Sequence, residues 1–256
     1  MKLVKNQFVH GIAAGNAQCG LWISMCSPVA AEISAWAGFD WALIDMEHSA
    51  NDYLSVMSQL HVFAASPTVA LVRPEANDPV AVKRLLDLGV QGLLFPMVQS
   101  VEEAKSAVAA TRYPPHGIRG VSGSTRANKF GRVEDYAARV ETETAVLLQL
   151  ETREALGKAL EIAAVDGVDG IFFGPADIAA DMGLLGRPLD DAVWAEIMPV
   201  AKALMEKGIP VGTLVTDPDF AAKLIGEGFT FVACGTDTGL LAQATSALAE
   251  RVKPRR

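Results

Sequence analysis

Two acidic residues follow short apolar runs of the sequence, close to the points where these runs end. Glu151 comes directly after the run 145–150, and Asp177 lies a few residues after the run 170–173. If the two runs are neighbouring strands of a parallel sheet, the carboxylates approach each other and repel. A hard divalent cation relieves this repulsion, because it accepts oxygen ligands from both groups and keeps positions for water and substrate. A divalent metal site and a pair of helix caps are the two interpretations of this pattern.

Two further features suit an organic acid that develops negative charge. Arg73 follows the run 69–72, where its guanidinium would stabilise an enolate oxygen, although an ion pair at the barrel rim is the alternative. In Gly174-Pro175-Ala176-Asp177, the glycine permits close approach, and the amides of Ala176 and Asp177 would begin a helix whose N-terminus suits a carboxylate. An α-keto acid could then chelate the metal through its keto oxygen and one carboxylate oxygen.

A general base is expected in Asp45-Met46-Glu47-His48, which ends another apolar run. His48 is the first candidate, because Asp45 could hold one ring nitrogen and leave the other to act through water. Glu47 is the second candidate.

The positions of the lysines argue against an imine mechanism. A Schiff-base aldolase needs a lysine on a strand that faces the barrel interior. In this sequence every lysine falls in a predicted helix, a loop or a chain end, and none falls in a predicted strand. If the protein makes or breaks a carbon–carbon bond, a metal rather than an imine is expected to stabilise the electrons of the intermediate.

The apolar runs that position these residues are continuous, as in strands buried on both faces of a parallel sheet. We predict strands at Cys19–Ile23, Trp41–Ile44, Thr68–Val72, Gly92–Phe95, Ala145–Leu150, Gly170–Phe173, Pro210–Leu214 and Phe231–Ala233. Segments with a helical period separate them, among them Val101–Thr111, Arg153–Ala164, Trp194–Lys207, Phe220–Glu227 and Leu240–Val252. Eight strands alternating with helices predict an α/β fold, a single (β/α)8 TIM barrel that spans residues 1–256 as one domain.

Smaller features of the sequence support a repeated unit. Four of the predicted strands are preceded by a glycine at a position typical of a helix C-terminus, at Gly38, Gly89, Gly167 and Gly228. The segment Arg112–Thr144 is the longest non-repeating piece, with a short helix predicted at 133–140, and we expect a functional loop or oligomer contact on the βα side. Residues 5–14 are predicted to form a helix that plugs the bottom of the barrel.

Composition narrows the class of protein. The net charge of −8 argues against a nucleic-acid surface, which needs a basic excess. No apolar run reaches about 18 residues, so no membrane span is expected. Three cysteines without metal-ligand spacing indicate free thiols in a reducing cytoplasm.

Five segments of the sequence together resemble the HpcH/HpaI aldolase (2,4-dihydroxyhept-2-ene-1,7-dioate aldolase) family, in order and over nearly the full length. These segments are Trp41–His48, Leu71–Pro74, Gly117–Gly120, Gln149–Thr152 and Gly174–Asp177. The resemblance implies a class II pyruvate aldolase that uses magnesium, manganese, cobalt or zinc. It also implies a homo-oligomer, often a hexamer built as a trimer of dimers that exchange the last helix.

The resemblance also implies roles for individual residues. Glu151 and Asp177 would bind the metal, Arg73 would stabilise the enolate, and His48 paired with Asp45 would be the water-assisted base. Asp87 would reach the active site of a neighbouring subunit. The pyruvate site would be lined by Trp22, Gln149, Gly174, Pro175 and Ala176.

The resulting hypothesis is reversible cleavage of a 4-hydroxy-2-keto acid to pyruvate or hydroxypyruvate and an aldehyde. A malyl-CoA or citramalyl-CoA type lyase would share the metal and the enolate, but the sequence has no basic patch suited to CoA. A non-catalytic binding barrel is the third hypothesis, and it would not need so many ionisable groups at one rim.

Overall fold

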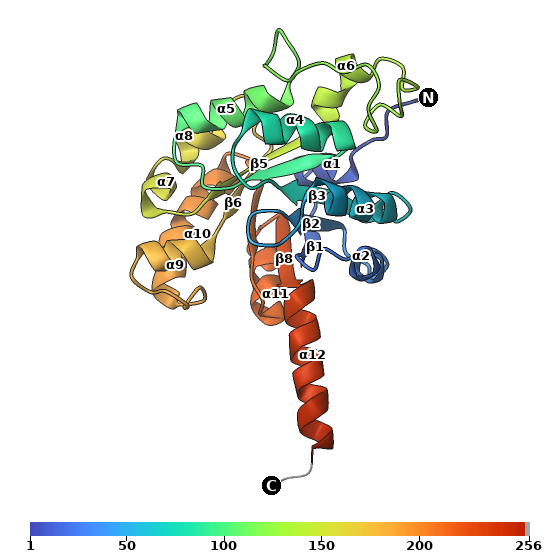
Figure 1. The fold of residues 1–256 in the computed structure, drawn as a ribbon. Coiled ribbons are helices and arrows are strands. Elements are labelled where there is room, and N and C mark those ends of the chain that lie inside the picture. The colour runs from blue at the N-terminus through green and yellow to red at the C-terminus, as the bar shows by residue number, and fades with distance from the viewer. Residues whose placement is uncertain (254–256) are drawn as a thin grey trace.

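The computed structural model describes residues 1–253 and shows a closed barrel of parallel strands that pair in chain order from β1 to β8 (Figure 1). The predicted (β/α)8 barrel is therefore confirmed, and the predicted strands differ from the observed ones only at their ends. The strands are β1 (Gln18–Ile23), β2 (Trp41–Asp45), β3 (Val69–Arg73), β4 (Gly92–Phe95), β5 (Ala145–Leu150), β6 (Gly170–Phe173), β7 (Val211–Leu214) and β8 (Phe231–Thr236).

Helices surround this barrel, and most begin at a side-chain cap such as Asp52, Asp78 or Ser100. The predicted helix Arg153–Ala164 is interrupted, because Lys158 ends one short helix and precedes the next. The helices are α1 (Gln7–Ala13), α2 (Pro28–Ala35), α3 (Tyr53–Phe63), α4 (Pro79–Leu88), α5 (Val101–Thr111), α6 (Tyr136–Arg139), the 3-10 helix η1 (Val140–Glu143), α7 (Arg153–Gly157), α8 (Ala159–Ala163), α9 (Pro175–Asp181), α10 (Asp191–Glu206), α11 (Pro218–Gly226) and α12 (Asp237–Val252).

The core has two layers because successive strand residues face opposite sides of the barrel wall. The outer layer joins strands to helices, and the inner cluster fills the barrel. Helix α1 closes the end where the strands begin: the Phe8 ring lies 5.6 Å from the Trp41 ring and 5.8 Å from the Phe231 ring, centroid to centroid. The predicted plug is therefore confirmed.

The four predicted helix-stop glycines all have a positive φ. Gly89, with φ of 90°, ends α4 in the left-handed conformation that a glycine adopts without steric cost. These turns return the chain to the start of the next strand.

The long segment 112–144 connects the end of α5 to the start of β5. It therefore lies at the end of the barrel where the strands begin, and its predicted position on the βα side is wrong. The segment follows α5, which was correctly predicted as a helix, and precedes the strand β5, so it leaves from a helix end and not from a strand end. The predicted short helix at 133–140 is observed as α6 followed by η1.

Helix α12 projects away from the barrel (Figure 1). Its apolar side chains Leu240, Leu241, Leu248 and Val252 are all exposed. Among residues 1–253, no helix combines the length and hydropathy needed to cross a membrane.

The α1 plug yields a prediction about stability. Phe8 is fully buried, so Phe8→Ala removes an aromatic ring from the closed end of the barrel and should lower the free energy of unfolding by about 3–5 kcal/mol. Urea denaturation of the two proteins measures this difference. Phe130→Ala is the matched control, because the Phe130 side chain is exposed and its loss should change stability by less than about 0.5 kcal/mol. Equal effects of the two substitutions would contradict the assignment of α1 to the core.

Candidate active site

The end of the barrel where the strands finish, here called the mouth, contains a cavity of about 580 Å³. This volume lies in the range of small-molecule sites. Eight of the residues predicted from the sequence line it, namely Trp22, His48, Arg73, Gln149, Gly174, Pro175, Ala176 and Asp177. Residues from distant parts of the chain therefore meet because the strands end at one rim.

Arg73 and Asp45 form a buried ion pair at the mouth. They end neighbouring strands in direct register, so their side chains leave the barrel wall side by side. Arg73 Nε donates to Asp45 Oδ1 over 2.9 Å, and Arg73 Nη2 donates to Asp45 Oδ2 over 2.7 Å. Burial would raise the pKa of Asp45, but hydrogen bonds and the positive charge of Arg73 outweigh it and lower this pKa. The pair is therefore charged and fixed in geometry.

Trp22 holds the other face of this pair. The Arg73 guanidinium lies 4.9 Å from the centre of the Trp22 ring, and Trp22 Nε1 donates to Asp45 Oδ2 over 3.2 Å. The alternative interpretation of Arg73 as an ion-paired rim residue is thus confirmed, yet Arg73 also lines the cavity. The Arg73 guanidinium therefore forms an ion pair at the barrel rim and also faces the cavity.

The expected bond between Asp45 and the imidazole of His48 is not observed, so this detail of the sequence prediction is wrong. Asp45 Oδ1 instead accepts the backbone amides of Glu47 and His48, which folds the chain into a tight turn after β2. The His48 ring is 68% exposed, and its Nε2 lies 3.9 Å from Glu47 Oε2. Glu47 Oε2 also lies 2.9 Å from Arg73 Nη1, and burial raises the pKa of Glu47. The carboxylate beside His48 is therefore Glu47.

Glu151 and Asp177 lie near each other, because β5 and β6 pair up to Leu150 and Phe173. Burial, together with the negative charges of Asp177 and Glu47, raises the pKa of Glu151 to about 8. Neither residue caps a helix: Thr152 caps α7, and α9 begins at Gly174 without a side-chain cap. The helix-cap alternative for this pair is therefore wrong.

The surroundings of Glu151 fix its orientation. Glu151 Oε2 accepts the amide of Met97 over 2.7 Å, and Glu151 Oε1 accepts Gln149 Nε2 over 2.9 Å. A Cβ at position 174 would lie 2.8 Å from Glu151 Cγ, so only glycine leaves room for this side chain. The carboxylate is thus held at the rim next to the cavity.

The donor set of the mouth fits a hard divalent cation. Two carboxylates face the same space, and the buried Gln149 Oε1 has no hydrogen-bond partner among the described residues. Within residues 1–253, no group of three or more His, Cys, Asp or Glu side chains has metal-binding geometry. A cation between Glu151 and Asp177 would accept oxygen ligands from both carboxylates and would keep further positions for water and substrate oxygens.

Asp87 lies far from this mouth. It is near the end of α4, where Arg119 Nη2 donates to Asp87 Oδ1 over 3.0 Å. The chain therefore does not bring Asp87 to its own cavity.

Two stretches that line the cavity were not predicted, Gly186–Asp190 and Leu214–Thr216. Val215 and Thr216 directly follow β7, so the rule that selected Arg73 and Glu151 would also have selected them. Arg187, which forms an ion pair with Asp190, lies in the turn between α9 and α10 and follows no strand.

The chain is similar to known proteins over most of its length. Residues 18–244 match the family model described as HpcH/HpaI aldolase/citrate lyase. A pyruvate aldolase of Rhizobium etli is 52% identical over 98% of this chain and 99% of its own length. A 4-hydroxy-2-oxo-heptane-1,7-dioate aldolase of Escherichia coli is 47% identical over 97% of this chain and 95% of its own length.

A solved structure has the same fold. The HpcH/HpaI aldolase/citrate lyase family protein of Burkholderia cenocepacia superposes with a TM-score of 0.93 and 36% identity, over 98% of this chain and 100% of that chain. Together with the family model and the curated relatives, this likeness confirms the resemblance of the five sequence segments: the chain belongs to the HpcH/HpaI aldolase/citrate lyase family.

Proposed function

We propose that this protein is a class II aldolase, a carbon–carbon lyase that cleaves 4-hydroxy-2-keto acids to pyruvate or hydroxypyruvate and an aldehyde. The observation that carries this proposal is the pair of carboxylates at the mouth: Asp177 lines the cavity together with the fixed Arg73 guanidinium, and Glu151 lies beside Asp177 at the rim. The names of the curated relatives, both aldolases, support it.

In this proposal Glu151 and Asp177 hold a divalent metal, which is magnesium, manganese, cobalt or zinc. When bound, the metal supplies a Lewis acid that polarises the keto group of the substrate. Gln149 and the backbone at Gly174–Ala176 line the same part of the cavity and suit the carboxylate end of the keto acid. Trp22 provides a flat apolar wall there, beneath the Arg73 guanidinium.

Arg73 has the role of stabilising the enolate oxygen as the bond breaks. Its Nε and Nη2 are engaged by Asp45 and its Nη1 is near Glu47, so the guanidinium is held before substrate arrives. A donor fixed in advance stabilises developing charge without a reorganisation cost at the moment of reaction.

His48 has the role of the base that removes the proton from the C4 hydroxyl. Its ring lines the cavity, and its exposure suits proton exchange through water. Glu47 is its carboxylate neighbour within the chain, in place of Asp45. We propose that Asp87 reaches the site of a neighbouring subunit and that its bond to Arg119 orients it.

We further propose that the chain acts as one domain over residues 1–256 in a homo-oligomer, a hexamer formed as a trimer of dimers. The exposed apolar side chains of α12 support exchange of this helix between subunits. Free thiols at Cys19, Cys26 and Cys234 support a cytoplasmic location.

The metal is tested by removing it. Dialysis against a chelator should abolish pyruvate release from a 4-hydroxy-2-keto acid, measured by coupled NADH oxidation, and added manganese or magnesium should restore it. Activity that persists after dialysis, in a sample shown by elemental analysis to lack divalent metal, would rule out the proposed role of Glu151 and Asp177.

The separate roles of His48 and Arg73 are tested with two reactions. Decarboxylation of oxaloacetate forms the same pyruvate enolate but requires no proton removal from a C4 hydroxyl. His48→Ala should therefore lower the kcat of aldol cleavage by about 10²–10⁴-fold and leave decarboxylation nearly unchanged.

Arg73→Ala should lower both activities, because each passes through the enolate. Arg153→Gln, at an exposed arginine outside the cavity, is the control and should lower neither activity.

Equal loss of both reactions in His48→Ala would contradict the assignment of His48 as the C4-hydroxyl base.

A further inference from the structure

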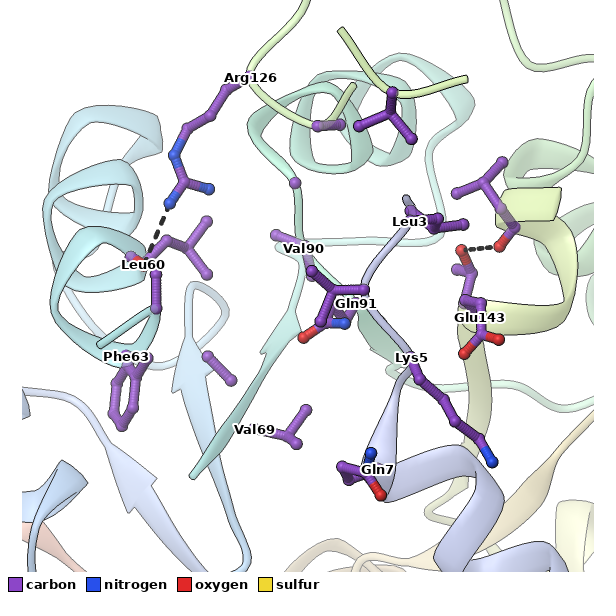
Figure 2. Close-up of a pocket in the computed structure, with 18 of the residues that line it drawn as sticks. Leu3, Lys5, Gln7, Leu60, Phe63, Val69, Val90, Gln91, Arg126 and Glu143 are labelled. Atoms are coloured by element: carbon purple, nitrogen blue, oxygen red, sulfur yellow. Dashed lines mark hydrogen bonds between the residues drawn. The ribbon is translucent and has the colours of Figure 1, made fainter. Parts of the chain in front are cut away.

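A second cavity, of about 400 Å³, lies at the end of the barrel opposite the mouth (Figure 2). Its walls are the N-terminal segment 2–7, the end of α3, the start of β3, the turn 89–91 before β4, and the long segment after α5. None of the residues assigned to the reaction lines it. The segment 112–144, for which the sequence predicts a functional loop or an oligomer contact, forms one of its walls.

The inside of this cavity is apolar. Leu60 and Phe63 from α3, Val69 at the start of β3, and Val90 just before β4 all line it and are buried from solvent. Figure 2 shows these side chains on the side of α3 and the strands, with Lys5 on the opposite side. A ligand with an apolar part, bound here, would bury its own hydrocarbon surface and that of the cavity wall.

The rim of the same cavity is cationic. Lys2, Lys5, Arg126 and Lys129 line it, and none of the four forms an ion pair within the described part of the chain. The lining carboxylate, Glu143, is engaged elsewhere: its Oε2 accepts the Asn6 amide over 2.7 Å and lies 3.0 Å from His10 Nε2. In a protein with a net charge of −8, this concentration of unpaired cations attracts an anion.

Arg126 is the cation that the fold holds most firmly. Its Nη1 donates to the carbonyl of Leu88 over 2.6 Å, and its Nη2 donates to the carbonyl of Leu60 over 3.2 Å, the bond drawn in Figure 2. The next residue, Ala127, donates its amide to the carbonyl of Asp87, and Gly89 leaves room for both residues against the end of α4.

These carbonyl bonds explain the position of Arg126 but do not neutralise its charge. Carbonyl oxygens near helix C-termini carry only partial negative charge. Burial lowers the pKa of Arg126. No carboxylate within residues 1–253 forms an ion pair with Arg126 that would offset this desolvation. A bound carboxylate would supply a counter-ion.

We propose that this cavity binds a small organic monocarboxylate with an apolar body. The hydrocarbon part would lie against Leu60, Phe63, Val69 and Val90, and the carboxylate would lie near Arg126, with the rim lysines adding to the attraction. The site is at the opposite end of the barrel from the catalytic cavity, so it differs from the keto-acid site of the proposed function.

The test uses 4-phenylbutyrate as the probe and isothermal titration calorimetry of the full chain. Pyruvate and Mg²⁺ are present at saturation so that the catalytic cavity is occupied. We expect one probe molecule per chain, no binding of inorganic phosphate, and weaker binding of 4-phenyl-1-butanol, which lacks the charge. Arg126→Gln should weaken binding of the probe about tenfold or more, because a charge-assisted hydrogen bond contributes about 1.5–3 kcal/mol.

Two matched controls separate binding from a general loss of structure. Arg132→Gln removes a neighbouring exposed arginine that does not line the cavity, and it should leave the affinity unchanged. Ala64→Trp places a large side chain at the cavity wall on an exposed position and should block the probe, whereas Ala65→Trp at the next exposed residue should not.

The proposal is overturned if the probe does not bind, or if it binds equally well to the wild type, Arg126→Gln and Ala64→Trp. Equal affinity for 4-phenyl-1-butanol would overturn the role of the cations. Because Ala64 and Arg126 line this cavity and not the one at the mouth, loss of probe binding in their variants reports on this site whether or not the aldolase proposal holds.

Discussion

The single guanidinium of Arg73 is shared between Asp45 and Glu47. Within residues 1–253 neither Glu151 nor Asp177, at the same rim, forms an ion pair. Four carboxylates, those of Asp45, Glu47, Glu151 and Asp177, therefore lie around the Arg73 guanidinium at the mouth of the barrel. Desolvation at such a rim disfavours each additional negative charge, as the raised pKa of Glu151 shows. The arrangement of the mouth is consistent with a divalent cation as the missing positive charge, and the proposed chemistry depends on it.

The barrel makes this charge imbalance possible because it fixes each side chain independently. Arg73 and Asp45 end strands that are in direct register, and Glu151 is held by the Met97 amide and by Gln149. Carboxylates that were free to move would separate and become solvated, whereas carboxylates held by a rigid rim keep a site that is ready for a cation.

The fold and most of the cavity could be predicted from the sequence, because both follow from one rule. Continuous apolar runs become strands of a closed parallel barrel, and the residue at the end of each run reaches the mouth, as Arg73 and Glu151 do. This rule does not describe side-chain direction within a turn. The backbone of the turn after β2 decides the partners of Asp45. The amides of Glu47 and His48 point toward the Asp45 carboxylate, which leaves the His48 imidazole beside Glu47. Arg187 could not be predicted for a related reason, since it enters the cavity from a turn between two helices.

The proposed metal site at the mouth is tested most directly by titrating Mn²⁺ into the metal-free protein and measuring binding by calorimetry, with the variants Glu151→Gln, Asp177→Asn and Glu47→Gln. We expect the wild type to bind one Mn²⁺ per chain. Binding should be lost or greatly weakened in Glu151→Gln and Asp177→Asn and retained in Glu47→Gln, whose carboxylate contacts Arg73. Unchanged Mn²⁺ affinity in the double variant Glu151→Gln/Asp177→Asn, with the fold intact by circular dichroism, would show that these carboxylates do not bind the metal.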